Sequence, residues 1–160
     1  MTFDFLVPFY KWLNTTSVSE YLQGTTYAFP VAQVFHIIAF TMFIGAVVGV
    51  CLRLLGFGMR RPVAELYEGV AKWSWCSLGA VVVTGILQGI AEPIKLSTNP
   101  AFGIKEALLP IFFLLYCFGY LGIVKPGKAE ANPMMVKLVG FSLMLCLTLI
   151  LVAGRSVGFV

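Results

Sequence analysis

Five polar or charged side chains lie within or at the ends of strongly apolar stretches, and their types could support chemistry: His36, Thr84, Gln88, Lys105 and Arg155. His36 is the only histidine of the chain and lies about two helical turns into the apolar stretch 29–57. An ionisable side chain inside a membrane span is rare and is by default a functional-site hypothesis. His36 is therefore the first candidate, and the other four are the residues expected near it.

Three interpretations of His36 stay open. In the first, a neutral imidazole bonds to Thr84, Gln88 or a backbone carbonyl and only locks two helices together. In the second, His36 is an axial ligand of a b-type haem, with Lys105 or Arg155 at the rim placed to meet the haem propionates. In the third, His36 carries protons or binds a metal ion in a transport path.

The haem interpretation requires a second component. Six-coordinate b-type haems in helical bundles usually use two histidines, and this chain has one. The iron would need a methionine, a five-coordinate state, or a histidine from another subunit. The haem hypothesis therefore implies a partner protein or a second copy of this chain.

Four apolar stretches are long enough to cross the ~30 Å of a bilayer core as helices. They cover about residues 29–52, 69–91, 102–124 and 134–154. The loops between them are short, so neighbours in sequence are expected to be neighbours in space. The fold class predicted is all-α, an integral membrane four-helix antiparallel bundle.

Counting residues inwards from one end of each span places the candidates relative to one another. His36 lies about eight residues, or ~12 Å, from that end, and Thr84 lies at a similar depth. Gln88 is one turn nearer the end, while Lys105 and Arg155 ring the mouth. The five side chains are therefore expected in one neighbourhood.

Residues 2–23 precede the first span and are too short and interrupted to cross the bilayer. Residues 2–14 place polar side chains near one side of a helix and aromatic and aliphatic ones over the rest, which predicts an interfacial amphipathic helix. Ser17 with Glu20 forms a capping-box pattern for a second short helix that ends near Gly24.

The composition excludes several classes of protein. With 59% hydrophobic and 11% charged residues, the chain cannot coat a water-soluble domain, so the lipid bilayer is its expected environment. The net charge of +4 comes from scattered basic residues without a patch, which argues against a nucleic-acid partner. The nucleotide-binding, hydrolase and zinc-protease motifs are missing, so a non-catalytic role is favoured.

The basic residues also predict an orientation. The loops after the first and third spans, with their flanks, hold seven basic residues: Arg53, Arg60, Arg61, Lys72, Lys125, Lys128 and Lys137. The opposite side of the membrane holds four: Lys11, Lys95, Lys105 and Arg155. Loops rich in Lys and Arg stay in the cytoplasm. Both termini are therefore expected in the periplasm of a bacterial inner membrane.

Several segments together resemble an uncharacterised bacterial four-helix inner-membrane family. The segments are the WLN-T of residues 12–15, Phe29-Pro30, His36 followed by LRLLG at 52–56, Thr84-Gly85, and NPAFGIK at 99–105. The resemblance covers about residues 10–125 and implies the fold but no activity. It extends distantly to membrane proteins of the copper-resistance D and b-type cytochrome sort. One position departs from the pattern, because Cys51 stands where this family has an aspartate before LRLLG.

The function that these residues favour is a small membrane subunit of a respiratory or electron-transfer complex, holding haem b or contacting a quinone through His36. Its partners would be other membrane or periplasmic subunits, or further copies of the chain. One alternative is a small transporter or channel for protons or metal ions, with His36 as the metal ligand. Another is a structural membrane anchor without a cofactor.

Overall fold

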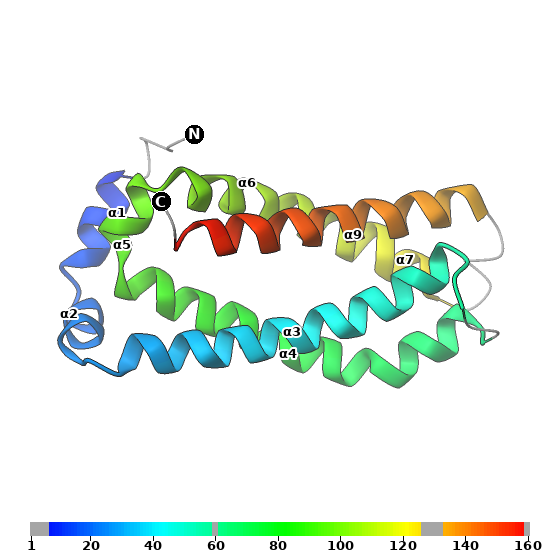
Figure 1. Cartoon of the computed structure of the whole chain (residues 1–160), viewed down its shortest axis with the longest axis horizontal. Coiled ribbons are helices and arrows are strands. Elements are labelled where there is room, and N and C mark those ends of the chain that lie inside the picture. Colours follow the sequence, from blue (N-terminus) through cyan, green and yellow to red (C-terminus); the bar gives the residue numbers. More distant parts are fainter. Residues whose placement is uncertain (1–6, 59–60, 126–132, 159–160) are drawn as a thin grey trace.

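The structure is a computed structural model that describes residues 7–58, 61–125 and 133–158. Within these ranges the chain forms helices and no strand (Figure 1). In chain order they are α1 (Val7–Asn14), α2 (Ser17–Gly24), α3 (Ala28–Leu54), α4 (Val63–Ala91), α5 (Pro93–Thr98), α6 (Pro100–Leu114), the π-helical η2 (Leu115–Tyr120), α7 (Leu121–Ile123) and α9 (Pro133–Ser156).

Four helical segments are long and apolar enough to cross a membrane: α3, α4, the continuous segment α6–η2–α7, and α9. The shortest of them contain 24 residues, which at 1.5 Å per residue extend over about 36 Å and exceed the ~30 Å of a bilayer core. The protein is therefore a small multi-pass membrane protein. The prediction of an all-α four-helix bundle is confirmed.

The helix bounds differ from the predicted ones mainly at α4 and in the third span. α4 begins at Val63, directly after Pro62, whereas the predicted span begins at 69. Its 29 residues extend over about 43 Å, so its ends project beyond a bilayer core. The third span changes from α- to π-helical geometry at Leu115, one turn after Pro110. Proline removes a backbone donor within that helix, but the sequence gives no direct signal for a π-helix.

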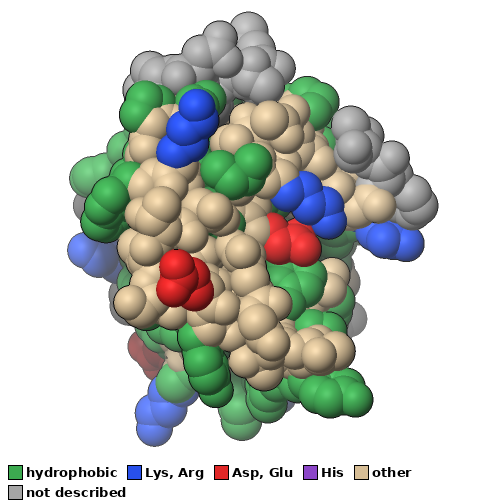
Figure 2. Space-filling view, turned by 90° about the vertical axis from the view of Figure 1, so that its left-hand side faces the viewer, with side chains coloured by type: hydrophobic (Ala, Val, Ile, Leu, Met, Phe, Trp, Pro, Cys, Tyr) green, Lys and Arg blue, Asp and Glu red, His purple; other side chains and the backbone are tan. Residues whose placement is uncertain are grey.

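The two N-terminal helices close one end of the bundle. α1 packs against α5, and its Tyr10 ring lies 6.5 Å from the ring of Phe102 on α6. Burial raises the pKa of Tyr10, and the nearby Glu106 carboxylate raises it further. Figure 2 views this end of the molecule, where basic and acidic side chains lie among polar and backbone atoms and hydrophobic side chains project mainly at the edges.

α2 is joined to the end of α4 by a buried hydrogen bond. The hydroxyl of Ser19, fully buried, donates to the carbonyl of Ile90 at 2.8 Å. The N-cap of α2 is Thr16, whose hydroxyl accepts from the Ser19 amide at 3.3 Å. The capping box predicted at Ser17 is therefore wrong by one residue, because the helix itself begins at Ser17.

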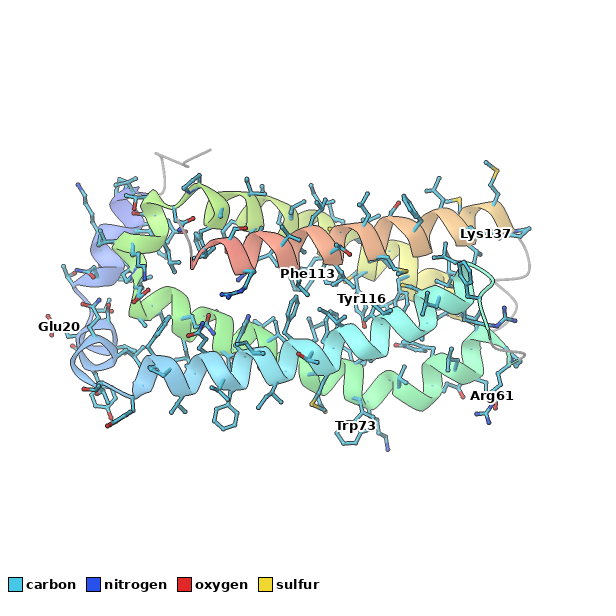
Figure 3. All side chains as sticks on the ribbon, viewed as in Figure 1. Glu20, Arg61, Trp73, Phe113, Tyr116 and Lys137 are labelled. Carbon is cyan, nitrogen blue, oxygen red and sulfur yellow. The ribbon has the colours of Figure 1, made fainter. Side chains whose placement is uncertain are left out.

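The long helices associate as two pairs, α3 with α4 and α6 with α9 (Figure 1). The pairs meet mainly through α3 and α9. At that crossing Gly140 of α9 lies against Leu54 and Cys51 of α3. Figure 3 shows Tyr116 between the two pairs and Trp73 pointing away from the bundle, in agreement with their exposed fractions of 0% and 62%.

The packed core occupies one half of the bundle. α3 contributes no buried residue before Ala39, and α4 contributes none between Leu78 and Ala91. Most of the core cluster lies in the other half and includes Phe43, Val47, Val50, Leu54, Tyr116, Tyr120, Leu143 and Leu147. α9 has buried residues along its whole length, as far as Ala153. α3 and α4 are therefore closely packed in the half where Leu54 and Val63 lie and less closely packed in the half that holds His36.

Two tyrosines of the π-helical turn are fully buried but differ in their hydrogen bonds. The rings of Tyr116 and Tyr120 stack at a centroid distance of 5.0 Å. The Tyr116 hydroxyl lies 3.0 Å from Ser74 Oγ, whereas the Tyr120 hydroxyl has no hydrogen-bond partner among the described residues. A buried polar atom without a partner is destabilising, so the two hydroxyls contribute with opposite sign.

Replacing each tyrosine by phenylalanine is expected to change the free energy of unfolding in opposite directions. Tyr120→Phe removes an unpaired hydroxyl and should stabilise the protein by about 1 kcal/mol. Tyr116→Phe leaves the buried Ser74 hydroxyl without its partner and should destabilise by about 1–2 kcal/mol. Equilibrium unfolding in a mild detergent measures both variants, and a loss of stability in Tyr120→Phe would contradict this account.

Candidate functional site around His36

A hydrogen bond between α3 and α4 fixes the imidazole of His36. Its Nδ1 atom lies 2.8 Å from Thr84 Oγ1, between residues 48 positions apart in the sequence. The two helices form the closest pair in the bundle, and their opposite directions bring these two turns to one level. The hydrogen bond that the first interpretation of His36 requires, one that joins two helices, is therefore present.

The hydrogen bonds of Thr84 determine the tautomer of His36. The Thr84 hydroxyl donates its single proton to the carbonyl of Ala80 at 2.6 Å, with Val81 O at 3.3 Å. The hydroxyl must therefore accept from His36, which requires the proton on Nδ1. In the neutral ring, Nε2 then carries a lone pair.

Two neighbours shape the space around the ring. Phe40, one turn along α3, stacks on His36 with centroids 6.2 Å apart and planes inclined by 13°. Gly85 lies beneath the ring, since a Cβ placed there would stand 3.4 Å from His36 Cε1. His36 itself is only partly buried, so the ring is held on two sides and accessible on others.

Lys105 brings a positive charge to the site from the opposite helix pair. It lies on the second turn of α6, and its ammonium group is close enough to His36 for their charges to interact. Its neighbour Glu106 interacts with Lys105 and with Tyr10 of α1. The side chains of α6 thus connect the surroundings of His36 with the N-terminal helix.

Gln88 lies one turn along α4 from Thr84 and is partly buried. Its side-chain Nε2 is shielded from solvent and has no hydrogen-bond partner among the described residues. An amide donor in this condition is costly, because its lost hydration is not replaced. Gln88 therefore offers an unused donor in the same region as His36.

Arg155 lies at the end of the bundle where α9 finishes. It lies on the last turn of α9, and its Nη1 is 3.9 Å from the position that a Cβ of Gly158 would take. At the same end of the bundle, Lys95 and Glu92 form an ion pair at 3.1 Å. Of the five residues named from the sequence, the structure brings His36, Thr84 and Lys105 together, with Gln88 one turn away.

Three residues near the site were missed in the sequence. Gly85 had a signal, because it lies beside Thr84 and forms a G-x-x-x-G pair with Gly89. Glu106 follows Lys105 directly and interacts with its ammonium group. Asn99 is buried, caps α6 by accepting from Ala101 and Phe102 amides at 2.9 and 3.2 Å, and donates to the carbonyl of Val157 at 3.1 Å.

Among the residues that the structure describes, no three His, Cys, Asp or Glu side chains converge to hold a metal ion. Cys51 and Cys146 are buried thiols and Cys76 and Cys117 are exposed ones, all of them free. A metal role for His36 stays a prediction.

Residues 9–160 match the model of a family described as a family of unknown function, DUF6644. No curated protein and no solved structure matches the chain. The match covers almost the whole chain, and the expectation of a family without an assigned activity is confirmed.

Proposed function

The chain belongs to the DUF6644 family of unknown function, and from the geometry around His36 we propose that it is a membrane subunit of an electron-transfer complex that binds a b-type haem through His36 Nε2. The observation that carries the proposal is the hydrogen bond from His36 Nδ1 to Thr84. A histidine that ligates a metal through one nitrogen donates its other N–H to a fixed acceptor, which sets the tautomer and the orientation of the ring.

The surroundings of His36 fit a large planar group in two respects. Around His36, segments 28–38 of α3 and 79–90 of α4 contain no buried residue, so these two segments are not closely covered by the opposite helix pair. Gly85 keeps the ring free of a neighbouring side chain on the α4 side. The donor set also fits, since a neutral imidazole is an ordinary axial ligand of haem iron.

The charges at the open end fit the haem propionates. The charge of Lys105, on the opposite helix pair, acts on His36, and its ammonium group would meet one carboxylate. Arg155 stands at the same end of the bundle, on the last turn of α9. A bound haem would supply one-electron oxidation and reduction, while His36, Thr84 and Lys105 would hold and orient it.

The single histidine has a consequence for assembly. A six-coordinate iron needs a second ligand, and this chain has no second histidine to give. A six-coordinate iron would therefore take a histidine from another subunit or from a second copy of this chain; a methionine ligand and a five-coordinate iron are the alternatives. With the loops after α3 and α7 in the cytoplasm, the site would open towards the periplasmic side of a bacterial inner membrane.

The test is a reduced-minus-oxidised absorption spectrum of the protein purified in mild detergent, with His36→Ala and Gln33→Ala as variants. Gln33 is exposed on α3 about one turn from His36, so it serves as the matched control. We expect a b-type band in the wild type and in Gln33→Ala, and its loss in His36→Ala. A featureless spectrum from folded protein purified with its native partners would overturn the proposal.

The unpaired amide of Gln88 favours a second candidate, a quinone or quinol site. The Gln88 amide would donate to a quinone carbonyl, and His36 Nε2 would accept from a quinol hydroxyl. Quinone that co-purifies with the wild type and is lost in both His36→Ala and Gln88→Leu, without a haem band, would support this candidate over haem.

The remaining alternatives are a transporter and an anchor. Transport of protons or metal ions has less support, because position 51 holds a fully buried cysteine where the resembling family has an aspartate. An anchor would show neither a haem band nor bound quinone in the wild type, and would tolerate His36→Gln with no loss beyond assembly. The distant likeness to copper-resistance D proteins and b-type cytochromes agrees with a membrane haem site but is an analogy of fold.

A further inference from the structure

A groove lies on the opposite half of the bundle from His36. It has a volume of about 290 Å³ and is lined by Tyr67, Glu68 and Trp75 of α4 together with Leu121, Val124 and Lys125 at the end of the third span. Most of the lining is apolar, and its two charged residues have opposite sign. It shares no residue with the candidate site around His36.

The aromatic wall of the groove is held in place from behind by the buried core. The Tyr67 ring packs edge-on against Tyr120 at 5.9 Å, and the Trp75 ring packs edge-on against Tyr116 at 6.0 Å. Both supporting tyrosines are fully buried. The groove is therefore a preformed feature whose wall does not depend on flexible side chains.

The two charges of the groove are available to a ligand. Glu68 and Lys125 are exposed, and neither forms an ion pair within the part of the chain that the structure describes. Glu68 lies in the second turn of α4, and Trp75 lies two turns further along, about 10 Å deeper. Lys125 follows the end of α7. Both charges therefore lie near the helix ends, at the level of lipid headgroups, and the apolar part extends into the bilayer.

We propose that this groove binds a zwitterionic phospholipid whose headgroup carries a phosphate and a primary ammonium, as in phosphatidylethanolamine. Lys125 pairs with the phosphate and Glu68 with the ammonium. The rings of Tyr67 and Trp75, with Leu121 and Val124, line the path of the glycerol backbone and an acyl chain. A headgroup with one charge satisfies only one of the two side chains, so the pair of opposite charges selects the zwitterion.

Native mass spectrometry of the protein in mild detergent tests this inference, by titration with phosphatidylethanolamine and phosphatidylglycerol of identical acyl chains. Glu68→Gln and Lys125→Gln change the groove. Glu65→Gln and Lys137→Gln are the matched controls, since both residues are exposed near the same ends of their helices but do not line the groove.

We expect the wild type to bind phosphatidylethanolamine about fivefold more tightly than phosphatidylglycerol. Glu68→Gln should remove this preference, Lys125→Gln should weaken both lipids, and the controls should leave both unchanged. Equal affinity of the wild type for the two lipids would overturn the proposal. So would a loss of lipid affinity in Lys137→Gln as large as that in Lys125→Gln, because it would show only a general attraction between lipid phosphates and basic side chains. So would the binding of neither lipid.

Discussion

Thr84→Val is expected to weaken haem binding by about ten- to a hundredfold while leaving the fold intact. Valine keeps the shape of threonine but cannot accept the proton of His36 Nδ1, which Thr84 Oγ1 accepts at 2.8 Å. The ring would lose its fixed orientation and its preferred tautomer, and loss of such a supporting contact reduces metal affinity by about this factor. Titration of the purified apoprotein with haem, followed by absorption, measures the change.

Thr41→Val is the matched control for this variant. Thr41 also lies on a long helix and donates to the carbonyl four residues earlier, Ile37, at 2.8 Å, but it is exposed and contacts no ring. It should bind haem as the wild type does. Equal affinity in Thr84→Val and Thr41→Val would mean that Thr84 only joins two helices.

Gly140→Leu is expected to destabilise the protein by about 3 kcal/mol, or to prevent assembly of the two helix pairs. A Cβ at this position would stand 3.1 Å from Leu54 Cβ and 3.3 Å from the Cys51 carbonyl oxygen. Both atoms belong to or lie next to the backbone of α3, so they cannot move aside without shifting the helix. Unfolding by heat or by denaturing detergent measures the loss.

Gly154→Leu provides the comparison on the same helix. A Cβ at Gly154 would meet no other atom within 4 Å, because that part of α9 faces open space. Its stability should stay within about 0.5 kcal/mol of the wild type. If both variants were equally destabilised, the cause would be the change in α9 itself rather than its contact with α3.

The sequence was most informative about the length of the helices and about the depth of His36 along its span. Apolar stretches of 21 to 24 residues leave few folds available in a bilayer, and the level of His36 counted along its span already pointed to Thr84. It was less informative about helix ends. The predicted span begins at residue 69, yet α4 begins at Val63 and includes Glu65 and Glu68, because a helix that leaves the hydrocarbon can continue into the headgroup region with charged side chains.

The arrangement of the helices could not be derived from the sequence. In a soluble protein the inward face of a helix is marked by apolar side chains. In α3 and α4 the apolar side chains are spread almost evenly around the helix, since lipid is as apolar as the interior. Nothing in the sequence distinguished residues 28–38, which contain no buried side chain, from the buried residues that follow. The unpaired amide of Gln88 likewise depends on atoms that only the folded chain places.

The π-helical turn of residues 115–120 also limits how the length of this chain can vary. A π-helical turn holds one more residue than the α-helical turn that it replaces. Removal of one residue there would restore α-helical geometry and leave the later positions on the faces that they occupy now, because the wide turn already accommodates that residue. Val124, buried in the core, and Leu121, which lines the groove beside Tyr67, would keep their places. Removal of one residue from the α-helical part before Leu115 would instead rotate the later positions by about 100° and turn both side chains away. A single deletion is therefore expected to be tolerated within residues 115–120 and to disrupt packing elsewhere in this span.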